Sequence, residues 1–234
     1  MKAAFLSVVT SMYNEEENVE RFVEEVEDAL KNQAYDSEII IVDNGSTDST
    51  GSRCDSLAAA HKNLVIIHAS KPTKGKGNGI RLALQAAKGQ HVSIMDGDLQ
   101  QYPADIPYLL EIMRKRRLDY IVGWRKPRHD PLHRIILSRI YNFMVKLLFN
   151  IPSWDIAGHP RVFRRECLKD IKIRSNKWII EVELPYYAKK GGFKGGWAVV
   201  RHRKREKGIS KLAIGDILYI FIGILKLRFG GFHE

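Results

Sequence analysis

The sequence lacks several features that would assign a protein quickly to a structural class. Only two of its 234 residues are cysteines, Cys54 and Cys167, and their wide separation argues against a disulfide framework or a cysteine metal site. No stretch reaches the roughly 18 apolar residues of a membrane-spanning helix. The apolar run at the start becomes acidic too soon for a signal peptide. These absences predict a reduced protein that stays in the cytoplasm.

Two common phosphate-binding motifs are also missing. The sequence has no Gly-x-x-x-x-Gly-Lys-Ser/Thr loop, and no Gly-x-Gly-x-x-Gly follows the first apolar run, which argues against a P-loop and a dinucleotide site. Acidic residues are outnumbered, 27 against 38 lysines and arginines, and the net charge of +11 predicts a polyanionic partner. Because nucleic-acid motifs and interleaved aromatic residues are absent, we expect an anionic membrane or a phosphorylated substrate rather than nucleic acid.

Strand-like and helix-like patterns alternate along the chain, whose length favours one principal domain. The strand-like runs are residues 4–11, 38–42, 64–68, 91–95, 119–123 and 197–200. Helical spacing of apolar residues appears over 19–30, 79–87, 106–117 and 133–149. This order predicts an α/β fold with a doubly wound, mostly parallel sheet and helices on both of its faces.

Polar residues follow three of the predicted strands. They are S-M-Y-N-E at 11–15, D-N-G-S at 43–46 and D-G-D at 96–98. Since doubly wound sheets bind ligands beyond the carboxyl ends of their strands, we expect these three segments to line one site. Asn14 is also placed to cap the first helix, with Glu17 reaching back from the third helical position.

Asp96 and Asp98 are one residue apart at the end of the fourth predicted strand. Two neighbouring carboxylates are costly to hold together unless a cation neutralises them, and hard oxygen ligands suit Mg²⁺ or Mn²⁺. The alternative is an acidic turn in which Asp98 caps a helix beginning near Pro103. The glycine- and lysine-rich segment 71–79 could bind a diphosphate near a helix N-terminus, although a solvated turn has the same composition.

Five motifs in order carry a resemblance to a known family. They read SMYNEEEN, IIIVDNGSTDST, KGKGNGIRLALQAAKG, MDGDLQQYP and IVGWR. From Val8 to Lys211 the chain resembles the family 2 glycosyltransferases, which have the GT-A fold. Within that family it is most similar to the dolichyl- and polyprenyl-phosphate sugar transferases, the group that includes dolichol-phosphate mannose synthase.

The resemblance implies metal-dependent transfer of a hexose, with inversion, from a nucleotide sugar to a polyprenyl or dolichyl phosphate. Mannose from GDP-mannose is the first expectation. UDP-glucose or UDP-GlcNAc, and a saccharide or protein acceptor, are the alternatives. A noncatalytic nucleotide-binding module is a further alternative, in which Asp98 would be dispensable. Asn44 departs from the family, which more often has a second aspartate there, so the base is left open.

The family motifs also imply roles for individual residues. The nucleotide sugar would meet Tyr13, Asn14, Glu15, Asp43, Ser46, Lys76, Arg81, Asp96, Arg205 and Lys211. The metal ligands would be Asp98 and Gln100, with Asp96 on the metal or the donor sugar. The catalytic residues would be Asp96, Asp98, Arg125, Arg134 and Ser138, of which Arg125, Arg134 and Ser138 would hold the acceptor phosphate.

The helix predicted over 133–149 presents two faces. We expect its core face to consist of Ile136, Ile140, Phe143, Met144 and Leu147. Arg134 and Ser138 then share the opposite face, four residues apart, where a solvated surface would explain Arg134 equally well. A lipid phosphate is already largely a dianion at neutral pH and needs no general base for its attack.

Possible general bases beyond the acidic motif are few. Asp155, His159, Glu181 and Glu183 are the candidates, and none is assigned this role. We interpret His159 as an ordinary loop histidine rather than a specificity determinant. Asp155 and Arg161 are predicted to form a buried ion pair, with Glu183 bracing the site in a similar way.

The C-terminal part divides into a basic loop and an apolar tail. Residues 1–211 are predicted to form the catalytic domain, and residues 212–234 a tail whose helix, from Ile214 to Phe229, is apolar on almost every side. Such a helix must be buried. The catalytic domain, the membrane interface, a small membrane subunit or a second copy of the chain could cover it. We expect peripheral association with the cytoplasmic face of a membrane.

Overall fold

The protein is described by a computed structural model that covers residues 5–69, 75–152, 154–204 and 214–230. The strands are β1 (Leu6–Met12), β2 (Ser37–Asp43), β3 (Leu64–His68), β4 (His91–Ile94), β5 (Tyr120–Arg125), β6 (Arg161–Arg164) and β7 (Gly195–Val200). The α-helices are α1 (Val19–Leu30), α2 (Thr50–Ala60), α3 (Lys76–Ala86), α4 (Ile106–Arg116), α5 (Leu132–Phe149), α6 (Ile180–Lys190) and α7 (Ile214–Phe229). Short 3₁₀ turns, η1 (Pro103–Asp105) and η2 (Arg165–Leu168), complete these elements.

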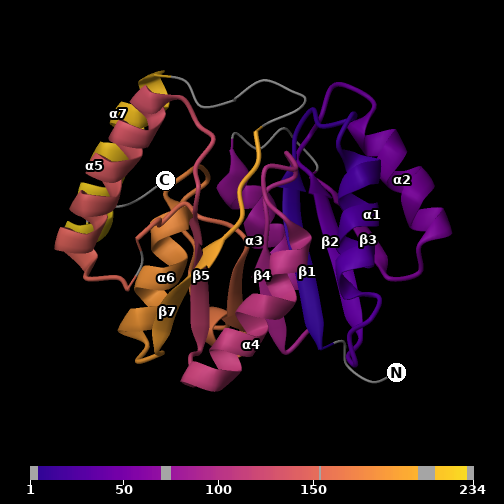
Figure 1. Ribbon diagram of the computed structural model, residues 1–234. Helices are drawn as coiled ribbons and strands as arrows, with labels where there is room; N and C mark the ends of the chain where they lie inside the picture. The colour runs from indigo at the N-terminus through magenta and orange to yellow at the C-terminus, as the bar shows by residue number, and fades with distance from the viewer. Residues whose placement is uncertain (1–4, 70–74, 153, 205–213, 231–234) are drawn as a thin grey trace.

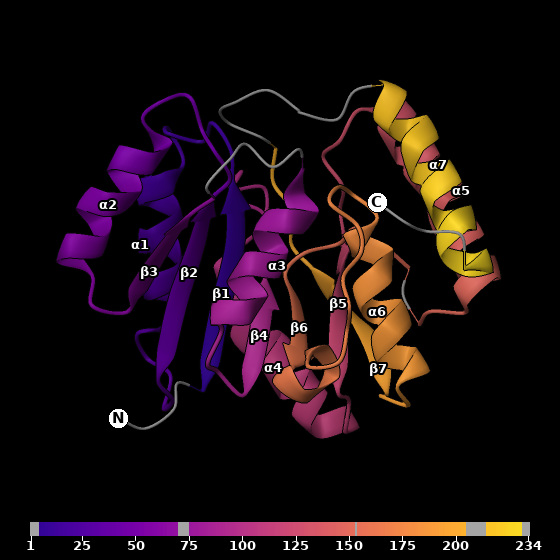
Figure 2. The same ribbon diagram turned by 180° about the vertical axis from the view of Figure 1, so that it is seen from behind.

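The seven strands form one sheet in the order β3-β2-β1-β4-β6-β5-β7. Only β6 runs antiparallel to its neighbours β4 and β5 within this sheet, so the predicted doubly wound and mostly parallel sheet is confirmed. Figures 1 and 2 show α1, α2 and α4 on one face and α3 and α6 on the other. The sequence patterns missed β6, which is inserted between two parallel strands.

Apolar side chains on both faces of the sheet explain this layering. One core cluster joins β1 to α1 through Leu6, Val8 and Phe22, and a second joins the opposite face to α3 and α6 through Ile80 and Leu184. Strands buried on both faces read as continuous apolar runs, as in the E-I-I-I-V of β2. The cores hold the carboxyl ends of the parallel strands at a common edge, at the top of Figure 1.

The first helix begins later than the predicted cap. Helix α1 starts after Asn18, which makes no side-chain capping bond. Asn14 instead has a left-handed backbone with φ of 50°, and its side-chain oxygen accepts a hydrogen bond from the Thr47 amide at 2.8 Å. The capping prediction for Asn14 is therefore wrong, because the residue is used to join two strand-end loops.

Helices α5 and α7 lie side by side beyond the β7 edge of the sheet (Figures 1 and 2). Val145 and Phe149 of α5 are buried with Ile224 and Leu227 of α7 in a third core cluster. The core face predicted for α5 is wrong for Ile136, Ile140, Phe143 and Leu147, which are 48–73% exposed. Its fifth member, Met144, does pack against the third cluster. None of the described helices combines the length and apolar character needed to cross a membrane.

Candidate functional site

The carboxyl ends of β1 and β2 bring together the residues predicted to contact the nucleotide. The Asn14 amide donates a hydrogen bond to Ser46 Oγ at 3.0 Å, and the Ser46 amide donates to Asp43 Oδ1 at 3.0 Å. The Glu15 amide donates to Thr50 Oγ1 at 2.8 Å. Asp43 is the last residue of the buried strand β2 and is itself 7% exposed. This edge therefore presents a fixed carboxylate beside backbone and hydroxyl groups, while Tyr13 is exposed next to it.

The glycine-rich segment at the start of α3 is packed against another loop. A Cβ added at Gly77 would lie 2.4 Å from the Ser175 carbonyl oxygen, so only glycine permits this approach. Arg81 donates to the Ile173 carbonyl at 3.3 Å and to Asn176 Oδ1 at 3.1 Å. The structure thus places Arg81 on the 173–176 loop, whereas Lys76 points toward Asp96. Arg205, Lys211 and the predicted loop residues 71–74 lie outside the described residues.

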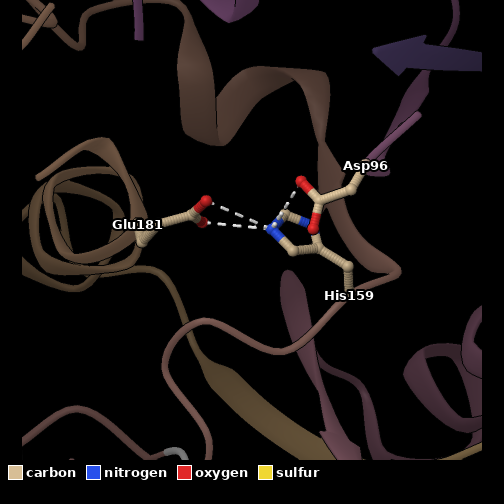
Figure 3. Close-up of side chains that lie close together, drawn as sticks. All are labelled: Asp96, His159 and Glu181. Carbon is tan, nitrogen blue, oxygen red and sulfur yellow. Dashed lines mark hydrogen bonds and ion pairs between the residues drawn. The ribbon is translucent and has the colours of Figure 1, made fainter. Parts of the chain in front are cut away.

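Five ionisable side chains form a buried charge cluster below the end of β4: Lys76, Asp96, His159, Arg161 and Glu181. The Lys76 ammonium contacts Asp96, Glu181 Oε1 at 2.6 Å and His159 Nε2 at 3.1 Å. Arg161 Nη2 lies 2.5 Å from Glu181 Oε2. Figure 3 shows the two carboxylates converging on the imidazole from opposite sides. Two cations thus face two carboxylates, which balances the cluster electrically when the histidine is neutral.

The hydrogen bonds of His159 define its protonation. Its Nδ1 lies 3.1 Å from the Ile94 carbonyl oxygen, which can only accept, so we assign the proton to Nδ1. The Nε2 atom then accepts from Lys76. Burial lowers the pKa of His159, in agreement with a neutral ring. Burial opposes ionisation of Glu181, but Arg161 and Lys76 outweigh it and hold its pKa well below the usual range.

His159 therefore differs from its interpretation as an ordinary loop histidine. It is 1% exposed, and its Nε2 approaches Asp96 and Glu181 so closely that the three side chains have the spacing of a metal site, with ligand atoms within 4.8 Å of one another. In the structure the Lys76 ammonium contacts all three of them. Sequence spacing gave no signal for this group, because His159 comes from the connection between α5 and β6 and Glu181 comes from α6.

The acidic motif forms a tight turn after β4. Asp96 Oδ2 accepts from Gln101 Nε2 at 3.0 Å, and the Asp96 amide donates to Gln101 Oε1 at 3.0 Å. Leu99 has φ of 58°, and the Gln100 amide donates to Asp98 Oδ1 at 3.1 Å. Asp98 and Gln100 are half-buried within this turn. Their carboxylate and amide oxygens are the donor set that suits a hard divalent cation, whereas Asp96 is held by Lys76 and Gln101.

The residues predicted for an acceptor phosphate lie near the β5 end and on α5. Arg125 forms a two-point ion pair with Asp155, with nitrogen–oxygen distances of 2.7 and 2.9 Å. Arg128 Nη1 donates to Ser138 Oγ at 2.6 Å, and its guanidinium also pairs with Asp130 at 2.7 Å. Arg134 is half-buried one turn before Ser138. The structure therefore adds Arg128 to this region, a residue that the family motifs did not single out.

The predicted pair of Asp155 with Arg161 is corrected by these contacts. Asp155 pairs with Arg125 rather than with Arg161, and Arg161 pairs with Glu181. Glu183 is fully buried and accepts hydrogen bonds from the amides of Arg174 and Ser175 at 2.7 and 3.1 Å. It therefore braces the loop before α6. Near the pair of Arg125 with Asp155, burial and the Arg125 guanidinium lower the pKa of His202 to about 4. The His202 imidazole is therefore neutral at physiological pH.

Comparisons with known proteins agree with this architecture. The model of the family described as Glycosyl transferase family 2 matches residues 7–172. The chain is 29% identical over 231 residues to the dodecaprenyl-phosphate galacturonate synthase of Rhizobium johnstonii, covering 96% of this chain and 66% of that protein. It is 28% identical over 221 residues to the polyprenol monophosphomannose synthase of Mycolicibacterium smegmatis, covering 90% of this chain and 82% of that protein.

A solved structure shares the fold. It is the glucosyl-3-phosphoglycerate synthase of Mycobacterium tuberculosis in complex with Mn²⁺, UDP and glucosyl-3-phosphoglycerate. The TM-score is 0.74 at 18% sequence identity, and the match covers 97% of this chain and 80% of that chain. This likeness, with the sheet order, confirms the predicted GT-A fold.

Proposed function

Because the chain belongs to glycosyl transferase family 2, we propose that it transfers a hexose from a nucleotide sugar to the phosphate of a polyprenyl or dolichyl lipid. Two relatives named for activity on such lipid phosphates support the acceptor class. They differ in the sugar, galacturonate in one and mannose in the other. Mannose from GDP-mannose is our first candidate, and UDP-glucose and UDP-GlcNAc are the next.

The ion pairs of the acceptor region carry this proposal. Arg125 and Arg128 lower the pKa values of Asp155 and Asp130 against the opposing effect of burial, and Arg161 with Lys76 does the same for Glu181. Carboxylates held in this way are poor general bases for a sugar hydroxyl. A phosphate monoester is largely a dianion at neutral pH and attacks without a base. The arginines beside Ser138 supply the positive charge that such an acceptor requires.

On the donor side, Asn14, Glu15, Asp43 and Ser46 would contact the nucleoside, and Lys76 the diphosphate or sugar. Asp98 and Gln100, with Asp96 beside them, would hold Mg²⁺ or Mn²⁺. A divalent cation at that place neutralises the charge that develops on the nucleoside diphosphate as it leaves. The inverted product then follows from attack by the acceptor phosphate on the face of the sugar opposite the diphosphate.

A donor panel tests the proposal. The purified chain is incubated with polyprenyl phosphate, Mg²⁺ or Mn²⁺, and labelled GDP-mannose, UDP-glucose, UDP-GlcNAc or an activated galacturonate. We expect one donor to give a labelled product that partitions into organic solvent and depends on the metal. A labelled product that remains in the aqueous phase would instead favour the alternative saccharide or protein acceptor.

Arg134→Ala is expected to raise KM for polyprenyl phosphate by about 10- to 100-fold, as the loss of a charge-assisted hydrogen bond does. Ser138→Ala should raise it less, because the hydroxyl is neutral. Steady-state kinetics with a short-chain, water-soluble acceptor measure both effects, and KM for the nucleotide sugar should stay unchanged. The matched control is Arg139→Ala on the exposed side of the same helix. Equal acceptor affinity in all three variants would reject the assignment.

We further propose that the apolar face of α5 and α7 lies against the cytoplasmic face of a membrane. Of the fifteen large apolar side chains exposed among the described residues, six are on α5 and four on α7: Leu132, Ile136, Leu137, Ile140, Phe143, Leu147, Leu218, Ile222, Leu225 and Phe229. So large an apolar surface marks an interaction site. Exposed Lys146 and Lys226 accompany it and suit anionic headgroups. Residues 212–234 would then act together with α5, whose inner face carries Arg134 and Ser138.

Replacing Leu147 or Phe143 by serine is expected to weaken binding to anionic liposomes by about tenfold or more each, because each large side chain buries apolar area in lipid. Cosedimentation measures this binding. The control is Val65→Ser, whose 37% exposed side chain lies on β3 at the opposite edge of the sheet (Figure 1). If Phe143→Ser and Val65→Ser reduced liposome binding equally, that result would contradict a membrane role for this face.

A further inference from the structure

His68 connects the base of the proposed nucleotide site to a helix at the edge of the molecule. It is the last residue of β3 and the register partner of Asp43, the last residue of β2. The Ala69 amide donates to the Asp43 carbonyl oxygen at 2.9 Å, which continues the strand pairing past the histidine. Asp55 approaches from α2, which packs along β3. His68 therefore lies between two carboxylates from different elements.

Both ring nitrogens of His68 face a carboxylate oxygen. Nδ1 lies 3.2 Å from Asp43 Oδ2, and Nε2 lies 2.9 Å from Asp55 Oδ1. Ionised carboxylates only accept hydrogen bonds, and a neutral imidazole has a single N–H. Only the imidazolium can donate to both partners at once. In agreement, the hydrogen bonds to Asp55 and Asp43 raise the pKa of His68.

Close packing fixes this arrangement from the side of α2. A Cβ added at Gly51 would lie 2.9 Å from Asp43 Oδ2, so the glycine is what lets the helix approach the carboxylate. Cys54, buried on the same helix, has its pKa raised to about 12 by burial and the nearby aspartates, so it is neutral. Among the described residues, the ionised groups that face His68 are thus Asp43 on β2 and Asp55 on α2.

We propose that His68 is a positioning residue that holds the Asp43 carboxylate in the orientation required by the nucleotide base. This inference rests on the proposed function, in which Asp43 accepts a hydrogen bond from the base. The Ser46 amide fixes Oδ1 of Asp43 and the imidazolium fixes Oδ2. A carboxylate that is fixed in this way can accept from the nucleotide base without reorganisation on binding.

The contribution of His68 has a defined pH dependence. Because its pKa is raised in the folded protein, the doubly bonded form is complete at low pH and is lost as the pH rises through that value. After deprotonation one of the two carboxylates faces a ring nitrogen without a proton. Asp43 is then held less firmly, and nucleotide binding weakens toward higher pH.

The test compares nucleotide binding of the full chain with its variants across about pH 5 to 8. His68→Ala is expected to raise the Kd for UDP or GDP about three- to tenfold at the acidic end. The ratio of the variant's Kd to the wild-type Kd should then fall toward one as the pH rises. Using the ratio cancels the titration of the nucleotide phosphate. Asp55→Asn removes one carboxylate that favours the imidazolium. In that variant the contribution of His68 to nucleotide binding should be lost at a lower pH. His61→Ala is the control, because His61 bonds Glu27 at 3.0 Å away from this edge.

The outcomes separate this inference from the proposed function. Asp43→Ala, which removes the acceptor oxygens, should abolish most nucleotide affinity. If it does so while the His68→Ala ratio stays constant with pH or equals one, the positioning role of His68 is overturned and the nucleotide site stands. If Asp43→Ala binds nucleotide like wild type, the base site lies elsewhere, and both the site assignment and the role of His68 are overturned.

Discussion

Asp98→Ala is expected to lower kcat for sugar transfer by about a thousandfold, which corresponds to the several kcal/mol that a metal ion contributes to charge stabilisation. Asp98 is half-buried at the mouth of the turn after β4. Its loss removes a charged oxygen ligand at the place where the leaving diphosphate would carry its charge. Turnover at saturating Mn²⁺, together with Mn²⁺ affinity measured by calorimetry, tests the prediction. Asp28→Ala, at a side chain that is 74% exposed on α1, is the control.

A second variant distinguishes two possible metal positions. Asp96, His159 and Glu181 have the spacing of a metal site, but the ammonium of Lys76 contacts all three. A metal ion among them would have to displace that ammonium from the two carboxylates. We therefore expect His159→Gln to retain Mn²⁺ affinity while Asp98→Ala loses it. The reverse result would place the metal in the buried charge cluster and contradict the role given to Asp98.

The elements of the fold were predictable because apolar patterns record burial directly. The predicted bounds of β3 and α7 coincide with the observed ones, and the buried E-I-I-I-V run lies within β2. Three polar strand ends were correctly placed at one edge, since the carboxyl ends of parallel strands must meet there. The face of α5 was not predictable in this way. Its apolar residues surround most of the helix, and periodicity alone does not say which side meets the core.

The ion-pair partners could not be predicted, because they depend on strand β6, which the sequence patterns did not reveal. Strand β6 enters between β4 and β5 and places Arg161 opposite Ile94, at the end of β4. His159, two residues earlier, is thereby carried beneath Asp96. Without β6, the sequence patterns indicate Asp155, which precedes Arg161 in the chain, as the partner of Arg161. In the structure Asp155 pairs with Arg125, and Arg161 pairs with a carboxylate from α6, that of Glu181.

Glu181→Gln is expected to lower the free energy of unfolding by about 3–5 kcal/mol, because it leaves buried cations without a carboxylate partner. Arg161 is fully buried and pairs with Glu181 Oε2, while Lys76 pairs with Oε1. Urea unfolding at neutral pH measures the change. Glu166→Gln, whose side chain is 59% exposed and paired with Arg164, is the control and should cost about 1 kcal/mol or less.

Acid and a compensating variant sharpen this prediction. Since the pKa of Glu181 is lowered in the folded chain, its contribution is complete above the unfolded value of about 4.3 and is lost as the pH falls below it. The difference in free energy of unfolding between wild type and Glu181→Gln should therefore become smaller in acid. Glu181→Leu combined with Arg161→Met should be more stable than Glu181→Leu alone, because the pair is replaced by apolar groups rather than broken. A double variant as unstable as the sum of its single variants would show that the two side chains are not coupled.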